Sequence, residues 1–286
     1  MNRLAPLVFV ILWSSAFITS KVIVDNASPF AALSLRFFIV AIGFFIFALL
    51  QNKKIIYDFA KILEAAFSGI LFHGLYLGGV FYSISIGMPT SVAALIVSMQ
   101  PVLTNIFAGP ILNEKVSWKQ WVGIFFGFTG SFVVLGFDIG GAIPIIGVIT
   151  SMLALFAATT ATLWQKKIST QLPLAVNNFY QAVGASIFLL LIMIFFENSF
   201  ILFNLNFILS MSWQIIFISF GAFTILMYLI KNGTASQTSN LFFLVPSISA
   251  LMAWFILDEI ITLYDIIGLL LSSFGVFIAT RKNTSI

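Results

Sequence analysis

Residues 101–130 of the chain read PVLTNIFAGPILNEKVSWKQWVGIFFGFTG, and residues 246–275 read PSISALMAWFILDEIITLYDIIGLLLSSFG. The second stretch repeats residues of the first at a constant separation of 145 positions, in the pairs Pro101 and Pro246, Glu114 and Glu259, Gly123 and Gly268, and Gly130 and Gly275. Lys21 and Lys166 have the same separation, so the repeat extends beyond these two stretches. The chain is therefore predicted to contain two copies of one hydrophobic unit joined head to tail.

The composition is that of a membrane protein. Hydrophobic residues make up 61% of the chain and charged residues only 8%, whereas a soluble domain carries about 25% charged residues. The net charge of +4 is small, and we expect no nucleic-acid partner. The absence of cysteine excludes disulfides and thiolate chemistry, and a single histidine cannot build a histidine metal site. We expect no metal, no cofactor and no catalytic residues.

The hydrophobic residues fall into stretches long enough to span a bilayer, which requires roughly 20 apolar residues each. Short connections rich in Gly, Pro, Asn and Asp separate them, and the longest connection runs from Glu197 to Met211. We predict an all-α membrane protein of ten transmembrane helices, at about 4–24, 30–50, 62–84, 90–111, 117–137, 143–165, 174–196, 212–231, 236–256 and 260–280.

The positions of the basic residues predict the orientation of these helices. If the N-terminus is cytoplasmic, eleven of the thirteen Lys and Arg residues fall on the cytoplasmic side. Lys21 then lies outside, and Arg36 lies within the second span. This bias agrees with the positive-inside rule. It predicts a multi-pass protein of the cell (inner) membrane with both termini in the cytoplasm.

Each half of the chain contains five predicted spans, which is an odd number. The first repeat, residues 1–138 with helices 1–5, and the second, residues 139–286 with helices 6–10, therefore enter the membrane from opposite sides. Such inverted repeats generate alternating access to a substrate site near the middle of the membrane. The spacing also predicts a helix-capping box at Ser117 and Gln120 and another, 145 positions later, at Thr262 and Asp265.

The order of these motifs resembles that of the EamA family of the drug/metabolite transporter superfamily. The resemblance rests on Pro101, Leu112-Asn113-Glu114, Gly123 and Gly130, on the second copy at Leu257-Asp258-Glu259, Gly268 and Gly275, and on an opening stretch with Trp13 to Phe17, Lys21, Pro29 and Arg36. It implies a ten-helix bundle that carries small metabolites, often as an exporter. The second half departs from the pattern, because Gln181 stands where Arg36 has its counterpart.

Several of the repeated residues are predicted to be structural. Small residues four apart permit close approach of helices in lipid, and they lie on one face in each copy: Gly123, Gly127 and Gly130, then Gly268, Ser272 and Gly275. Pro101 and Pro246 are expected to kink their helices. The helix dipole disfavours an acid at a helix C-terminus. Glu114 and Glu259 are therefore expected to anchor hairpins, for example through the amides that open the next helix.

A second set of residues is predicted to line a substrate site: Trp13, Ser14, Ser15, Arg36, His73, Tyr76, Gln100, Thr159, Trp164, Tyr180 and Asn240. Charged or polar groups within a span indicate function. Each has a structural alternative. Arg36 could extend to lipid phosphates, and His73 could be a satisfied core residue. The Ser and Thr hydroxyls could form hydrogen bonds between neighbouring helices. Gln100 and Asn240 could belong to purely structural proline kinks. The Trp and Tyr side chains could lie in the aromatic belt at the membrane–water interface.

No Asp or Glu lies in the middle of any predicted span. Small multidrug pumps of the superfamily that this chain resembles carry a carboxylate in their first helix, which binds cations and protons. The resemblance therefore implies a neutral, zwitterionic or anionic metabolite, such as an amino acid or related compound, and proton coupling would depend on His73 or on loop acids. An intramembrane enzyme acting on lipid or peptide would need a nucleophile with a base, paired acids or a metal site. A channel would need charged rings or a carbonyl filter. Neither these features nor those of an enzyme are visible in the sequence, so both functions are alternatives to the expected transporter. We expect a small molecule and the lipid bilayer as partners, and the oligomeric state stays open.

Overall fold

The computed structural model describes residues 4–88, 90–135, 143–257 and 262–280, and these residues form helices joined by short connections. An isolated bridge between Ala27 and Ile201 is the one extended pairing among them. The helices of the first half are α1 (Ala5–Asn26), α2 (Pro29–Leu50), α3 (Phe59–Gly69), η1 (Ile70–Tyr76), α4 (Leu77–Ser85), α5 (Thr90–Val97), α6 (Gln100–Leu112) and α7 (Trp118–Leu135). Those of the second half are α8 (Ile145–Ile168), α9 (Leu174–Phe196), α10 (Leu205–Trp213), η2 (Gln214–Ala222), α11 (Phe223–Asn232), α12 (Ala235–Ser239), η3 (Asn240–Leu244), α13 (Val245–Leu257) and α14 (Leu263–Thr280).

Eight helical segments are long and apolar enough to cross a membrane, which confirms the membrane class of the fold. They are Ala5–Asn26, Pro29–Leu50, Phe59–Ser85, Val92–Leu112, Ile145–Ile168, Leu174–Phe196, Leu205–Asn232 and Leu263–Thr280. The remaining two predicted spans, 117–137 and 236–256, correspond to α7 and to α12, η3 and α13. These elements are helical, but they are not among the eight.

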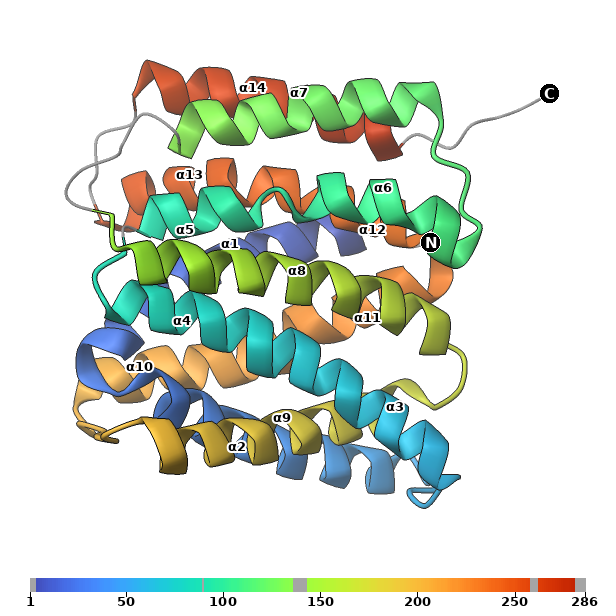
Figure 1. Cartoon of the computed structure of the whole chain (residues 1–286), viewed down its shortest axis with the longest axis vertical. Helices are drawn as coiled ribbons and strands as arrows, with labels where there is room; N and C mark the ends of the chain where they lie inside the picture. The colour runs from blue at the N-terminus through green and yellow to red at the C-terminus, as the bar shows by residue number, and fades with distance from the viewer. Residues whose placement is uncertain (1–3, 89, 136–142, 258–261, 281–286) are drawn as a thin grey trace.

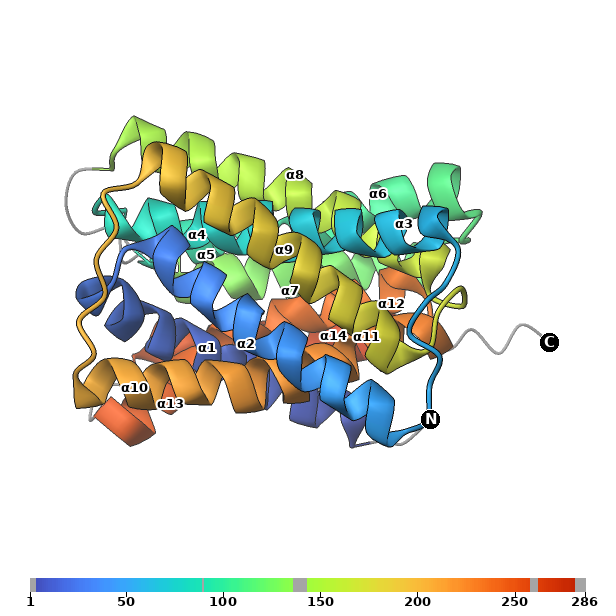
Figure 2. The same ribbon diagram turned by 90° about the horizontal axis from the view of Figure 1, so that it is seen from below.

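The helices form a bundle in which elements from the two halves of the chain alternate. The most extensive interfaces pair α7 with α14 and α2 with α9. Figure 1 shows the first pair along the top of the bundle and the second pair along the bottom, with α1, α4 and α8 between them. Figure 2 shows the same bundle from below, where α2 and α9 cross. Both main interfaces therefore join one half of the chain to the other.

Two of the predicted spans contain a π-helical segment. The π-helix η1 interrupts the segment from α3 to α4, and η2 interrupts the segment from α10 to α11. Residues 70–76, shifted by 145 positions, become 215–221, which lie within η2. The π-helices therefore follow the same repeat as the prolines and glycines. Because a π-helix has wider turns than an α-helix, each one changes which side chains face the bundle interior.

The interface between α7 and α14 is formed by glycine backbones. A β-carbon added to Gly275 would lie 2.3 Å from the Gly127 nitrogen, and one added to Gly123 would lie 2.5 Å from the Gly275 carbonyl oxygen. A β-carbon on Gly130 would lie 2.4 Å from the Ser272 nitrogen. Gly268 belongs to the same interface, since its β-carbon would meet the Gly130 carbonyl oxygen at 2.7 Å. Any side chain at these positions would force the two helices apart.

The expectation that Glu114 binds the amides of the next helix is wrong. Its carboxylate accepts hydrogen bonds from the backbone amides of Ala235 and Ser236, at 2.8 and 3.1 Å, which open α12 in the other half of the chain. The next helix, α7, does not need it, because Ser117 and Gln120 form the predicted capping box there. Glu259, its repeat partner, lies outside the described residues.

The predicted connection from Glu197 to Met211 is too long, because α10 begins at Leu205. The Asn204 side chain accepts a hydrogen bond from the Phe207 amide at 2.9 Å and caps this helix. Asn204 therefore starts a helix within the stretch that the sequence predicts to be a connection. The Glu197 carboxylate in the shortened connection accepts hydrogen bonds from the Phe30 and Ala31 amides, and so caps α2.

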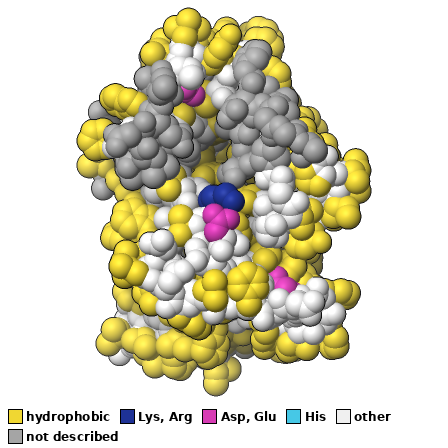
Figure 3. All heavy atoms as spheres, turned by 90° about the vertical axis from the view of Figure 1, so that its left-hand side faces the viewer, with side chains coloured by type: hydrophobic (Ala, Val, Ile, Leu, Met, Phe, Trp, Pro, Cys, Tyr) yellow, Lys and Arg dark blue, Asp and Glu magenta, His cyan; other side chains and the backbone are white. Residues whose placement is uncertain are grey.

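The outer surface is largely apolar, with large hydrophobic side chains exposed on most of the long helices. Figure 3 shows one end of the bundle, where few charged side chains are visible among apolar ones. Among the described side chains, one salt bridge is formed, between Lys21 and Asp25 at 2.7 Å on the surface of α1. Lipid is therefore the expected environment of most of this surface.

Candidate functional site

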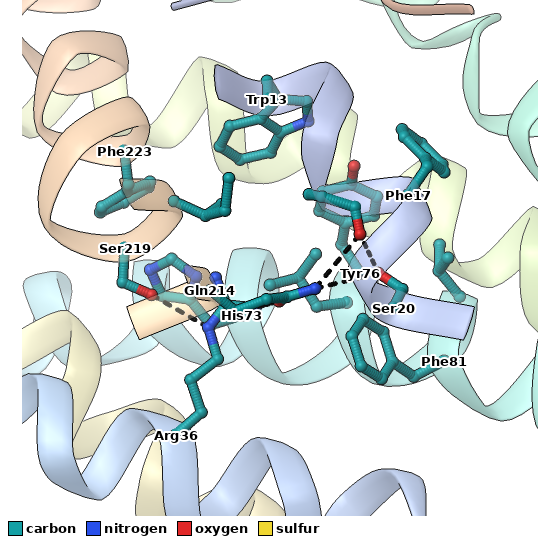
Figure 4. Close-up of a pocket in the computed structure, with 14 residues that line it drawn as sticks. Trp13, Phe17, Ser20, Arg36, His73, Tyr76, Phe81, Gln214, Ser219 and Phe223 are labelled. Carbon is teal, nitrogen blue, oxygen red and sulfur yellow. Dashed lines mark hydrogen bonds between the residues drawn. The ribbon is translucent and has the colours of Figure 1, made fainter. Parts of the chain in front are cut away.

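A small cavity lies inside the bundle between α1, α2, the η1–α4 segment and the η2–α11 segment (Figure 4). Its volume is about 30 Å³, which is roughly twice the volume that one water molecule requires. Four of the predicted site residues line it: Trp13, Arg36, His73 and Tyr76. The other lining residues are Ala16, Phe17, Ser20, Leu77, Val80, Phe81, Gln214, Ile218, Ser219 and Phe223.

The Arg36 side chain points into the bundle and not toward lipid. It is only 3% exposed. Its Nε donates a hydrogen bond to the Ser219 hydroxyl at 3.0 Å, and its Nη1 donates to the Gln214 amide oxygen. The guanidinium also lies 5.1 Å from the centre of the Phe37 ring. Of the two interpretations of Arg36 in the sequence, the structure therefore rejects the extension to lipid phosphates.

Both acceptors of Arg36 come from the π-helix η2. Gln214 and Ser219 are five residues apart, and in a π-helix residue i+5 returns to the position above residue i. In an α-helix the neighbours along one face are three and four residues apart, so these two side chains would diverge. The local π geometry thus brings an amide and a hydroxyl to the same guanidinium.

Gln214 also connects this site to α1. Its Nε2 lies within hydrogen-bond distance of the Ala16 carbonyl oxygen at 3.2 Å, the Thr19 hydroxyl at 3.0 Å and the Ser20 hydroxyl at 3.2 Å. Gln214 therefore bridges α1 and Arg36 of α2 through one side-chain amide. We call the side chains of Arg36, Gln214, Ser219 and Ser20 the Arg36 network; Figure 4 shows it at the edge of the cavity.

His73 lies next to the network but is held by aromatic rings. Its ring is 4.4 Å from the ring centres of both Phe37 and Phe223, and it is 4% exposed. Within the described part of the chain its Nδ1 has no hydrogen-bond partner. His73 therefore supplies a free polar atom in a mostly aromatic wall, which Trp13 and Tyr76 continue.

The hydroxyl groups of the predicted site residues Ser14, Ser15 and Thr159 form hydrogen bonds with a neighbouring helix or within their own helix. The Ser14 hydroxyl donates to the Val245 carbonyl oxygen at 3.2 Å, and the Ser15 hydroxyl accepts from the Trp213 indole at 2.8 Å. The Thr159 hydroxyl donates to the carbonyl oxygen one turn earlier in α8. None of the three is among the residues that line the cavity.

Two predicted aromatic residues lie away from the cavity. The Trp164 indole donates to the Glu64 carbonyl oxygen at 3.2 Å, and the Tyr180 hydroxyl donates to the Ile55 carbonyl oxygen at 3.0 Å. Both bonds attach helices of the second half to the segment around residues 55–64 of the first half. Their polar atoms are occupied by backbone groups in this conformation.

Gln100 and Asn240 belong to a second buried polar cluster, between α6, α8 and η3. The Gln100 amide donates to the hydroxyls of Thr104 and Thr162 at 3.1 and 3.0 Å, and the Asn105 amide donates to the Asn240 oxygen at 2.8 Å. Pro101 lies at the start of α6, where the helix is interrupted after Val97, and Pro246 lies at the start of α13. Gln100 and Pro101 therefore lie directly after the interruption at Ser98 and Met99, whereas Thr104 and Asn105 lie further along α6.

A third polar cluster occupies the position related to the Arg36 network by the repeat. Gln181, the counterpart of Arg36, accepts hydrogen bonds from the Gln165 amide at 3.2 Å and from the Ser68 hydroxyl at 3.5 Å. Gln165 is in turn the repeat counterpart of Ser20. The two halves of the bundle thus have matching polar networks, but only the first contains a charge.

Gln214, Ser219 and Ser20 are site residues that were not predicted from the sequence. One signal was available, because a buried arginine needs acceptors and no acid lies in the middle of a span. A glutamine within a span, such as Gln214, was therefore a candidate partner. The aromatic lining residues Phe81 and Phe223 carried no such signal, since the chain contains 34 phenylalanines.

Comparisons with known proteins agree on one family. The sequence model of the EamA-like transporter family matches residues 4–136 and again residues 145–281. Uncharacterized transporter YvbV of Bacillus subtilis (strain 168) is 27% identical over 282 residues, which cover 96% of this chain and 90% of that protein. An uncharacterized transporter of Archaeoglobus fulgidus is 26% identical over 278 residues, with 96% of both chains covered.

A further relative is the uncharacterized inner membrane transporter YedA of Escherichia coli (strain K12), which is 22% identical over 272 residues and covers 94% of this chain and 87% of its own. A crystal structure with 19% sequence identity superposes with a TM-score of 0.81, covering 97% of this chain and 95% of that one. This structural match supports the fold alone.

Proposed function

Because this chain belongs to the EamA-like transporter family, we propose that it exports a small metabolite, an amino acid or related compound, by alternating access. Family membership and the relatives make the chain a multi-pass membrane transporter and not an enzyme. The cargo, the direction and the mechanism are the proposal. The observation that carries them is the cavity inside the bundle, lined by Arg36, His73 and aromatic rings.

We further propose ten spans in two inverted repeats, 1–138 and 139–286. The 145-residue repeat of the π-helices supports this arrangement, as do the interfaces between equivalent helices, α2 with α9 and α7 with α14. Helix α1 begins and α14 ends at the same end of the bundle, on the right in Figure 1. This agrees with an even number of spans.

The proposed location is the cell (inner) membrane with cytoplasmic termini. The connections that follow α2, α6 and α8 lie at the same end as the start of α1 (Figure 1). Seven of the ten lysines lie in these connections or in the helix ends next to them. By the positive-inside rule this is the cytoplasmic end. One relative is named an inner membrane transporter, which supports the same location.

Alternating access requires a constriction on each side of the cavity that opens in turn. The two matching polar networks are the proposed constrictions. The Arg36 network connects α1, α2 and η2, and the Gln181 network connects α3, α8 and α9. Arg36 is seven residues from the non-cytoplasmic start of α2, and Gln181 is seven residues from the cytoplasmic start of α9. The networks therefore belong to opposite sides of the membrane in the proposed topology.

An aromatic wall with a few polar groups suits a metabolite that has both apolar and polar parts. The described cavity, about 30 Å³, is too small for an amino acid, so the substrate must enter a more open conformation. A carrier that changes conformation in each cycle shows saturable flux, whereas an open pore does not.

The test is flux through purified protein in liposomes, with pooled amino acids and related metabolites loaded inside. We expect saturable efflux of at least one compound above that of empty liposomes. Cells that contain the protein should also accumulate the same compound in their medium faster than cells that lack it. Absence of flux for every compound, or flux proportional to concentration without saturation, would contradict the proposal.

A further inference from the structure

The Arg36 guanidinium is a buried positive charge without a negative partner in the described part of the chain. Its hydrogen-bond acceptors, the Gln214 amide and the Ser219 hydroxyl, are both neutral. Among the described residues, no Asp or Glu lines the cavity. The acids with hydrogen-bond partners are used elsewhere: Asp25 pairs with Lys21, Glu114 and Glu197 bind helix amides, and Asp58 and Asp265 cap their own helices.

This arrangement leaves part of the guanidinium free. Arginine has five N–H donors, and only two of them have acceptors here. The free donors include those of Nη2, which together with a neighbouring nitrogen forms the two-pronged edge that matches a carboxylate. A buried, incompletely satisfied cation destabilises the empty protein, and such residues within a membrane span commonly mark a substrate path.

We propose that the transported substrate carries a carboxylate that binds Arg36 and replaces the Gln214 amide oxygen there. This inference rests on the proposed function and specifies its substrate class. A single guanidinium offsets one negative charge, so a monoanionic carboxylate leaves no buried charge unpaired, whereas a doubly charged phosphate ester would leave one. The surrounding rings of Trp13, Tyr76 and Phe223 accept an apolar or aromatic remainder.

Two features of the cavity fit this assignment. The free space of about 30 Å³ holds about two water molecules, so a whole substrate binds there only if it displaces contacts among the lining residues. The Gln214 oxygen is the neutral acceptor already in place. The free His73 Nδ1 remains for a second polar group of the same molecule.

Replacement of Gln214 would also couple binding to movement. Gln214 is bonded to α1 through its Nε2 and to α2 through its oxygen on Arg36. When a carboxylate takes the place of that oxygen, Gln214 keeps its hydrogen bonds to α1. Arg36 then donates its hydrogen bonds to the substrate instead of to Gln214. The link between α2 and α1 through Gln214 is then broken, which loosens the side of the cavity that the Arg36 network closes.

Binding to purified protein in detergent tests the inference, measured as a rise in the midpoint of thermal unfolding. The probe is 3-phenylpropionate, compared with its neutral amide and with 3-phenylpropylamine, which keep the ring but lack the negative charge. We expect only the carboxylate to raise the midpoint. In Arg36→Gln its affinity should fall at least about 30-fold, as expected when one partner of a buried charged pair is removed.

Two further variants separate binding from folding. Lys21→Gln removes one exposed positive charge from the same end of α1 as Ser20 and should leave probe binding unchanged. Gln214→Glu places a carboxylate inside the protein next to Arg36. It should fold, with a midpoint at or above that of the wild type, and should no longer bind the probe. A purely structural role of Arg36 predicts unchanged probe binding in Gln214→Glu.

The inference is overturned if wild-type protein does not bind the carboxylate, if it binds the amide or the amine equally well, or if Arg36→Gln or Gln214→Glu binds the carboxylate normally. A lipid headgroup is the other source of a monoanion. If phosphatidylglycerol in the micelles raises the midpoint only when Arg36 is present and abolishes the probe's effect, the site belongs to lipid and the inference is also overturned. Probe binding without any saturable flux in liposomes would instead contradict the proposed transport and leave the anion site standing.

Discussion

At the scale of single residues, burial decides what each polar group can do. Arg36 and Gln181 occupy equivalent positions, yet only the arginine lies at the edge of the cavity and leaves donors free. Glycine has the opposite role in the α7–α14 interface. There the absence of a side chain allows backbone atoms of the two helices to approach within the space that a β-carbon would occupy. Arg36 therefore acts at the cavity, whereas the glycines act in the interface between α7 and α14.

Gly275→Ala is expected to destabilise the protein by about 1–3 kcal/mol, because its β-carbon would meet the Gly127 nitrogen at 2.3 Å and α14 would have to move. Thermal unfolding in detergent, followed by the loss of the monodisperse size-exclusion peak, measures this.

Gly109→Ala is the matched control. A β-carbon there would meet only the Glu114 carbonyl oxygen, at an ordinary 3.6 Å, and alanine favours the helix. Its unfolding midpoint should equal or exceed that of the wild type. If Gly275→Ala were as stable as Gly109→Ala, the α7–α14 interface would not depend on glycine.

At the scale of helices and their ends, the two halves are connected by carboxylates that cap helices far away in the sequence. Glu114 at the end of α6 caps α12, and Glu197 after α9 caps α2. Carboxylates at helix N-termini are stabilised by free amides and by the helix dipole. These contacts hold short or broken elements in register with the long helices, and α12, with only five residues, depends on such a contact most.

Glu114→Gln is expected to weaken the cap on α12, with a local loss of about 0.5–2 kcal/mol, because the negative charge and one of two acceptor oxygens are removed. Hydrogen–deuterium exchange of the peptide that contains Ala235 and Ser236 should become faster, while exchange in α2 should not change.

Glu64→Gln removes the same charge from α3, where no helix amide is bound to the carboxylate in the described residues. It should leave exchange at Ala235 unaltered. Equal exchange of this peptide in wild type and Glu114→Gln would show that α12 does not rely on Glu114.

At the scale of the whole molecule, the proposed alternating access depends on how the two halves of the chain pack together. Helices from the two copies alternate through the bundle, so that movement of one copy against the other changes the surroundings of the cavity (Figure 1). Ser20 and Gln165 are repeat counterparts, and each belongs to one of the two polar networks. In an alternating carrier, one of them should be accessible to water when the other is not.

Single cysteines test this, because the natural chain has none. We expect Ser20→Cys and Gln165→Cys to react with a water-soluble maleimide in opposite phases when a transported compound is added. The measurement is the labelling rate in membranes. Thr280→Cys, at the end of α14, should react at a constant rate and serves as the control. Parallel changes at Ser20 and Gln165 would contradict alternation.

The proposed topology makes a separate prediction. A fluorescent protein fused after Ile286 should fluoresce in a bacterial host, and alkaline phosphatase fused at the same point should be inactive, because the C-terminus is expected in the cytoplasm. Active phosphatase at this position would require an odd number of spans or an inverted orientation.

The sequence by itself determined the membrane class, the approximate position of each helix and the family. Hydrophobic length and repeat spacing suffice for these properties, because lipid requires every spanning segment to satisfy its own backbone hydrogen bonds. The sequence also predicted Trp13, Arg36, His73 and Tyr76, which line the cavity, since charged or aromatic groups within a span are conspicuous.

Only the tertiary structure decided which of these groups meet. Ser14 and Trp164 donate hydrogen bonds to carbonyls of neighbouring helices, and Tyr180 donates one to the connection between α2 and α3. Glu114 caps α12 instead of the next helix. The pairing of Arg36 with Gln214 and Ser219 depends on a π-helix, whose wide turn cannot be inferred from apolar residues alone. The physical reason is that hydrophobicity places segments in lipid, whereas the partner of each polar group depends on how helices distant in the chain pack together.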